Sequence, residues 1–225
     1  MRQALIKTAT ALSGLSIAAT LYLNYKKQSL ASRVTHFSKR GQLSLSTPRN
    51  ISSLPPEVFS EKYYAVYDYA SVSTPLHSLP DLSTRELLTL LVRRNMSYFA
   101  SSPQARLLKL RLPADADAEI HLSFDSKCLE TLEFEEGDLV CNAYRIVLRS
   151  DERIEFEFLL GVQGRLVVCV EVVGDEVTFH NETVMWRGAD ESVGMPLERR
   201  LLNWVHEYTA WWMLSSGVDS LMAMK

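Results

Sequence analysis

Residues 153–187 read RIEFEFLLGVQGRLVVCVEVVGDEVTFHNETVMWR, the clearest strand pattern in the chain. Charged and apolar residues alternate from Arg153 to Phe158, which predicts a strand with one solvated and one buried face. Glycines flank the next turn, and the Gly174-Asp175 dipeptide is a hairpin signal. The sequence therefore predicts successive strands at residues 153–160, 165–173 and 176–187.

Upstream of this stretch, the pattern predicts more strands and one helix. A Tyr- and Val-rich alternation predicts the first strand at residues 63–73. Ser83 and Glu86 form a capping box that opens a helix running to about Ala100, and Pro103 closes it. The remaining predicted strands are residues 106–112, 118–124 and 139–149.

Downstream, the chain ends in a long predicted helix. Pro196 stands where such a helix begins. Apolar residues then recur at helical spacing to about Ser215. They are Leu197, Leu201, Trp204, Val205, Tyr208, Trp211 and Trp212.

The element order is one strand, one helix, six strands and a long terminal helix. This order resembles the helix-grip fold of the START/SRPBCC superfamily, which includes lipid-transfer proteins, polyketide cyclases and coenzyme Q-binding proteins. The segment FEEGDLV at 134–140, with strands at 144–148 and 155–158, resembles the strand entry of some members. One departure is the single helix after the first strand, where the superfamily has two.

The expected fold is therefore α+β, with a curved antiparallel sheet of about seven strands gripping the C-terminal helix. A hotdog fold and an NTF2-like cone remain alternatives. The resemblance implies a cavity between the sheet and the terminal helix that takes a hydrophobic ligand. The expected ligand-binding residues are Trp204, Tyr208, Trp211 and Trp212 from the helix and Trp186 from the last strand.

The candidate catalytic residues are His180 and Glu182, two apart on the last strand, and Glu171 on the strand before it. A histidine beside a carboxylate can transfer protons. The alternative is that these side chains face water on an exposed strand face. No Ser-His-Asp order, HExxH, GxSxG or Walker motif occurs, so the sequence leaves open whether the protein is an enzyme.

The three cysteines, Cys128, Cys141 and Cys169, lack the spacing of a zinc site. We expect them to be buried as small apolar side chains. The sequence predicts neither a metal nor a cofactor. No basic stripe with interleaved aromatic residues is present, so we expect no nucleic-acid partner.

The N-terminal segment differs from the rest of the chain in charge. The first 56 residues carry eight Lys/Arg and no Asp/Glu, whereas the remainder carries 16 basic and 27 acidic residues, a formal charge of −11. Eighteen uncharged residues, Thr8 to Tyr25, lie between Lys7 and Lys26, which is just long enough for a membrane-spanning helix. A mitochondrial presequence and a secretory signal are the alternatives.

These observations divide the chain into a membrane anchor or targeting segment at 1–27, a flexible tether at 28–60 and a single α+β ligand-binding domain at 61–225. The predicted function is a membrane-tethered domain that binds a hydrophobic small molecule such as a lipid, isoprenoid or polyketide. The alternatives are a non-redox cyclase, dehydratase or isomerase on the same scaffold, and an accessory protein without a small-molecule site.

Overall fold

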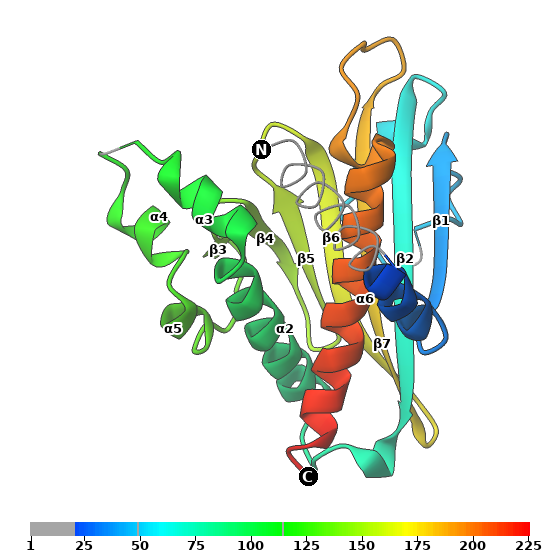
Figure 1. The fold of residues 1–225 in the computed structure, drawn as a ribbon, viewed down its shortest axis with the longest axis vertical. Coiled ribbons are helices and arrows are strands. Elements are labelled where there is room, and N and C mark those ends of the chain that lie inside the picture. Colours follow the sequence, from blue (N-terminus) through cyan, green and yellow to red (C-terminus); the bar gives the residue numbers. More distant parts are fainter. Residues whose placement is uncertain (1–20, 49, 114) are drawn as a thin grey trace, which may run out of the picture.

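The computed structural model describes residues 21–48, 50–113 and 115–225, which form one sheet with helices across one of its faces (Figure 1). Within these residues the sheet has seven strands in the order β1-β2-β7-β6-β5-β4-β3, and every neighbouring pair is antiparallel. The strands are β1 (Thr35–Gly41), β2 (Tyr63–Pro75), β3 (Leu139–Val140), β4 (Tyr144–Arg149), β5 (Arg153–Phe158), β6 (Gln163–Val173) and β7 (Glu176–Gly188).

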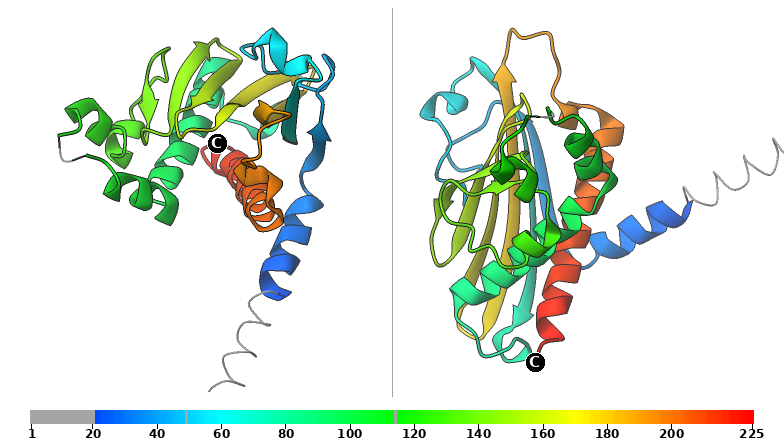
Figure 2. Two further views of the ribbon diagram at one scale, coloured as in Figure 1. Left: turned by 90° about the horizontal axis from the view of Figure 1, so that it is seen from above. Right: turned by 90° about the vertical axis from the view of Figure 1, so that its left-hand side faces the viewer.

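The described residues contain five labelled α-helices and three short 3₁₀ turns. They are α2 (Thr84–Ala100), α3 (Pro103–Leu110), α4 (Ala118–Leu122), α5 (Ser126–Leu129) and α6 (Arg200–Met222), with 3₁₀ turns η1 (Pro56–Phe59), η2 (Leu76–Ser78) and η3 (Pro196–Glu198). Residues 21–31 are also helical. The two long helices, α2 and α6, lie across the same face of the curved sheet (Figure 2). We call this the inner face and the opposite one the outer face.

The main core lies between the inner face and these two helices. Leu88 of α2 and Leu214 of α6 are buried there against sheet residues such as Val170 and Phe179. The predicted fold class is confirmed: the structure is α+β, with a curved antiparallel sheet and a long C-terminal helix. β5, β6 and β7 occupy the three strands predicted from residues 153–187, and Gly174 takes the left-handed conformation of the hairpin turn, with φ of 60°.

Two predicted strands, residues 106–112 and 118–124, are wrong. These residues lie largely in helices α3 and α4. Pro103 does not merely end α2, because it is the first residue of α3, and the Ser102 side chain caps that helix by accepting a hydrogen bond from the Ala105 backbone N–H. The Ser-Pro pair is a helix start signal that the sequence interpretation overlooked.

The single strand predicted at 139–149 is divided into β3 and β4. Cys141 and Asn142 both have positive φ, 51° and 46°, and the chain turns back on itself there. β3 then pairs with β4, with Leu139 opposite Arg145. Nothing in the apolar pattern marks this turn, because Cys141 rather than Gly occupies a left-handed position.

Residues 28–60, predicted as a flexible tether, contain structure that the sequence did not indicate. β1 pairs along β2 from Thr35 opposite Ser71 to Gly41 opposite Ala65. Residues 42–60, which we call the strap, then cross the outer face. The strap buries Leu43, Ile51, Leu54 and Val58 against the outer-face side chains of the sheet.

The predicted membrane anchor at residues 8–25 falls mostly on residues 1–20, which lie outside the described residues. Across residues 21–48, 50–113 and 115–225, no helix is long and apolar enough to cross a membrane. Lys27, the last residue of the predicted anchor segment, forms an ion pair with Glu207 of α6. Within the described residues, these findings contradict the predicted single-pass anchor and the membrane location inferred with it.

Candidate functional site

The sheet separates the predicted site residues onto two faces. The β2–β7 register sets Tyr69 opposite Glu182, and the β6–β7 register sets Cys169 opposite His180. Residues opposite one another share a face, and Tyr69, Cys169 and Trp186 are buried with the strap. His180, Glu182 and Trp186 therefore lie on the outer face, whereas α6 and its tryptophans cover the inner face.

Glu182 is fully buried rather than exposed to water. Its carboxylate accepts hydrogen bonds from Tyr67 Oη at 3.0 Å and from Asn50 Nδ2 of the strap at 2.6 Å. A buried carboxylate needs such donors to offset its lost hydration. Glu182 thus joins the strap to the sheet.

His180 is also buried, and the structure brings it together with Glu171. Tyr69 Oη lies 3.0 Å from His180 Nδ1, and Glu171 Oε2 lies 3.4 Å from His180 Nε2. The Glu171 side chain is itself largely exposed. This row of groups runs from the buried sheet to solvent, but it does so on the face away from α2 and α6.

A second buried carboxylate, Glu155 on β5, was missed by the sequence interpretation. It accepts hydrogen bonds from the backbone N–H of Ser52 at 2.8 Å and of Ser53 at 2.9 Å, and from Ser52 Oγ at 2.6 Å. The alternation of Arg153, Glu155 and Glu157 indicated a water-facing side. The strap covers that side, so Glu155 is a structural anchor.

The five predicted ligand-binding aromatic residues do not converge on one cavity. Trp186 packs on the outer face with Arg165, whose guanidinium carbon is 5.7 Å from its ring centroid. On α6, Trp211 is buried in the core, while Trp204 and Tyr208 stack at 5.8 Å. Trp212 faces outward and meets Tyr98 of α2 edge-on at 5.6 Å.

A groove does lie beside α6, on the side where α2 runs next to it. Its volume is about 580 Å³. The wall residues include Leu90, Arg94, Ser97 and Tyr98 of α2, Ser126 of α5, and Gly217, Leu221 and Met224 of the C-terminal segment. These α2 residues follow helical spacing on a side of the helix other than Leu88 and Val92, which pack into the core. We call this hollow the α2–α6 groove.

Arg94 of α2 is a charged residue on the wall of the α2–α6 groove. Its guanidinium donates to Asn95 Oδ1 and to Ser216 Oγ, both at 3.1 Å, and stands 4.7 Å from the Tyr98 ring centroid. Among the described residues, none of the acidic side chains, including Glu130 of the same groove, forms an ion pair with it. Its charge is therefore available to a ligand.

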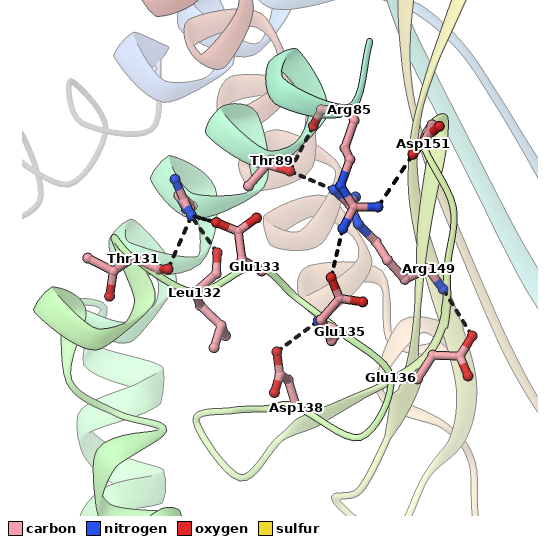
Figure 3. A network of polar contacts seen from close by, with 11 residues as sticks. Arg85, Thr89, Thr131, Leu132, Glu133, Glu135, Glu136, Asp138, Arg149 and Asp151 are labelled. Atoms are coloured by element: carbon pink, nitrogen blue, oxygen red, sulfur yellow. Dashed lines mark hydrogen bonds and ion pairs between the residues drawn. The ribbon is translucent and has the colours of Figure 1, made fainter. Parts of the chain in front are cut away.

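The neighbouring arginines are, by contrast, used within the protein. Arg93 donates to the backbone oxygens of Leu132 and Thr131 and pairs with Glu133. Figure 3 shows the adjoining network, in which Arg85 pairs with Glu135 and Asp151. Its hydrogen bond to Asp151 raises the pKa of Arg85.

Arg149 lies in the same network and donates to Thr89 Oγ1 at 2.6 Å (Figure 3). Burial lowers the pKa of Arg149, and the adjacent Arg85 lowers it further. The Nε and Nη1 atoms of Arg149 have no hydrogen-bond partner among the described residues, but Arg149 does not line the α2–α6 groove.

Two of the three cysteines, Cys141 and Cys169, offer no reactive thiolate. Burial raises the pKa of both the Cys141 and the Cys169 thiol to about 12, so both stay protonated near neutral pH. Cys128 is partly buried. Within the described residues, no group of three or more His, Cys, Asp or Glu could hold a metal ion.

No protein-family model matches this chain, and no curated sequence matches it. Among solved structures, the crystal structure of CalU16 from Micromonospora echinospora is similar with a TM-score of 0.32 and 12% sequence identity. That match covers 84% of this chain and 96% of CalU16. The antiparallel sheet and the C-terminal helix are compatible with the element order expected from the sequence, and we infer neither family, ligand nor reaction from the CalU16 match.

Proposed function

We propose that this protein binds a small amphipathic organic anion, an apolar molecule bearing a carboxylate or a similar acidic group, in the α2–α6 groove. The observation that carries this proposal is the Arg94 guanidinium. It is held in place by neutral partners on the wall of a hollow of about 580 Å³. Ligand sites of this kind measure about 300–1,000 Å³ and combine apolar walls with a few placed polar groups.

The rest of the groove supports an apolar ligand body. Leu90, Leu221 and Met224 supply flexible or branched apolar surface along one side. Tyr98 and Ser97 lie next to Arg94 on α2 and provide hydroxyl groups near the charged end. A guanidinium suits a carboxylate because it donates two parallel hydrogen bonds.

Acid–base catalysis is less well supported than binding. A catalytic His180–Glu182 pair would have to open into the space that holds the ligand. Both residues are instead buried on the outer face, where Glu182 is hydrogen-bonded to Asn50 of the strap. The observations therefore support a binding protein, and the hydrophobic-ligand function predicted from the sequence is retained with a different site.

The test uses the fluorescent sulfonate 1-anilinonaphthalene-8-sulfonate as the probe and dodecanoate as a competitor. Dodecanoate should displace the probe better than uncharged dodecanol does. In Arg94→Gln the advantage of dodecanoate should fall by about tenfold, the effect of losing one charge-assisted hydrogen-bonded contact. The inhibition constant of dodecanol, corrected for the weaker binding of the anionic probe, should be the same for both proteins.

Arg106→Gln is the matched control, since Arg106 is an exposed residue of α3 and the substitution makes the same change of charge. It should leave both competitors unaffected. Equal effects of the two arginine substitutions would reject the groove as the site, and so would a parent protein that binds no probe.

A further inference from the structure

The ammonium group of Lys27 lies among aromatic rings of α6. Its Nζ atom is 4.9 Å from the ring centroid of Trp211 and 5.5 Å from that of Trp204. It also forms an ion pair with Glu207, on the helical turn between these two tryptophans. One cation thus contacts two indole faces and one carboxylate.

The side chains around this ammonium group are held in place by contacts with other residues. Tyr208 stacks on Trp204 with ring planes 4° apart, and the His36 ring lies 4.3 Å from that of Trp211. Asn203 Nδ2 donates to Glu207 Oε1 at 2.7 Å and orients its carboxylate. We call Trp204, Glu207 and Trp211 the α6 cage.

The α6 cage needs a cation. The Lys27 and Glu207 side chains are only 15% and 18% exposed, so Glu207 without its partner would be a poorly hydrated charge. A partly desolvated ammonium gains the most from aromatic faces, and such cages are the usual means by which proteins hold organic ammonium ions.

The segment that supplies Lys27 is otherwise lightly attached. Within residues 21–31, only Lys27, Leu30 and Ala31 are shielded from solvent to any extent, and Leu21, Tyr22 and Tyr25 are exposed. The other ion pair of this region, Arg33 with Asp219, is on the surface and contributes little. A segment with so few buried contacts opens at small cost in free energy.

We propose that the α6 cage is a binding site for a small organic ammonium ion, and that Lys27 occupies it as an internal ligand. The site is separate from the α2–α6 groove, which involves neither Lys27 nor the cage residues. Because Lys27 belongs to the same chain, it competes at a high effective concentration. The free ligand therefore binds when the N-terminal helix moves away.

The experiment uses the full chain with tetramethylammonium chloride as the probe and sodium chloride as the ionic-strength control. Binding is followed by tryptophan fluorescence and by the shift in melting temperature. Lys27→Ala should bind the probe at least about tenfold more tightly than the parent, because the internal competitor is gone. Lys26→Ala, a neighbouring exposed lysine, should behave like the parent.

Adding Glu207→Gln to Lys27→Ala should abolish the response, and so should adding Trp204→Phe together with Trp211→Leu. If Lys27→Ala folds only when tetramethylammonium is present, the site is also supported. An unfolded or unresponsive Lys27→Ala at high probe concentration overturns the proposal. A response that survives the Glu207→Gln change overturns it as well.

Discussion

Leu91 of α2 packs directly on Gly217 of α6: a Cβ atom placed at position 217 would lie 2.3 Å from Leu91 Cδ1. Non-bonded carbon atoms do not approach that closely, so a side chain at position 217 requires the Leu91 side chain or the helix backbone to shift. Gly217 also lines the α2–α6 groove. The close approach of the helices therefore sets both the core packing and the floor of the proposed site.

Gly217→Ala should destabilise the fold by about 1–3 kcal/mol, the usual cost of overpacking, despite the better helix propensity of alanine. Urea denaturation measures this difference. Ser220→Ala, at an exposed position of the same helix, should change stability by less than about 0.5 kcal/mol. A Gly217→Ala variant more stable than the parent would contradict the observed helix contact.

Glu155→Ala should cost about 3 kcal/mol or more, because it leaves the backbone N–H groups of Ser52 and Ser53 without their acceptor under the strap. Glu157→Ala is the control on the same strand. Its ion pair with Arg165 is partly exposed and should contribute less than about 1 kcal/mol. Equal losses measured by denaturation would show that the strap is not anchored at Glu155.

Trp211→Ala and Trp212→Ala test which side of α6 faces the core. Trp211 is 4% exposed and Trp212 is 36% exposed. Truncating the buried ring should cost about 3–5 kcal/mol, and truncating the outward ring clearly less. Thermal and chemical denaturation of both variants measures the ranking, and a reversed ranking would contradict the orientation of the helix.

The pH dependence of stability should report on Glu198. Its hydrogen bonds with Arg187, together with one from the Met195 backbone N–H, hold the pKa of this carboxyl below its ordinary value of 4.5. A lowered pKa in the folded state adds stability that is present above pH 4.5 and is lost as the pH falls through the folded value.

Glu198→Gln should accordingly weaken the protein at pH 7 by about 1 kcal/mol. The variant and the parent should converge in stability as the pH is lowered below 4.5. Denaturation curves at pH 7 and at acidic pH measure the gap. A gap that stays constant would assign the loss to something other than ionisation.

Removal of residues 1–60 tests the predicted boundary of the ligand-binding domain at residue 61. The truncated chain lacks β1, which covers the edge of β2, and the strap, which covers Glu155 and Glu182. We expect a lower and broader thermal transition than for residues 21–225. Equal melting temperatures for the two chains would support the predicted domain boundary at residue 61.

The local sequence pattern was sufficient to predict elements that are determined by residues close together in the sequence. Alternation predicted β5, β6 and β7, and the reciprocal hydrogen bonds of Ser83 and Glu86 are present at the start of α2. The local sequence pattern did not predict β1, whose sequence THFSKRG has little apolar character. An edge strand of this kind is stabilised by pairing with β2, which no local pattern records.

The candidate site could be predicted only in part for a similar reason. The sequence indicated an aromatic terminal helix, but it placed the ligand space between that helix and the sheet, whereas the groove lies between α6 and α2. It did not indicate Arg94, because one arginine among several on α2 differs from the others only in lacking an acidic partner, and the partners come from distant segments.

By itself, the sequence determined the α+β class, the strands from 153 to 187 and the long terminal helix, since these follow from periodicity and capping. Only the tertiary structure decided which face each side chain meets. Glu155 and Glu157 have the same local pattern, yet the strap buries one and leaves the other partly exposed. Period two places such residues on one side of a strand, but contacts from remote parts of the chain decide whether that side meets water, protein or a ligand.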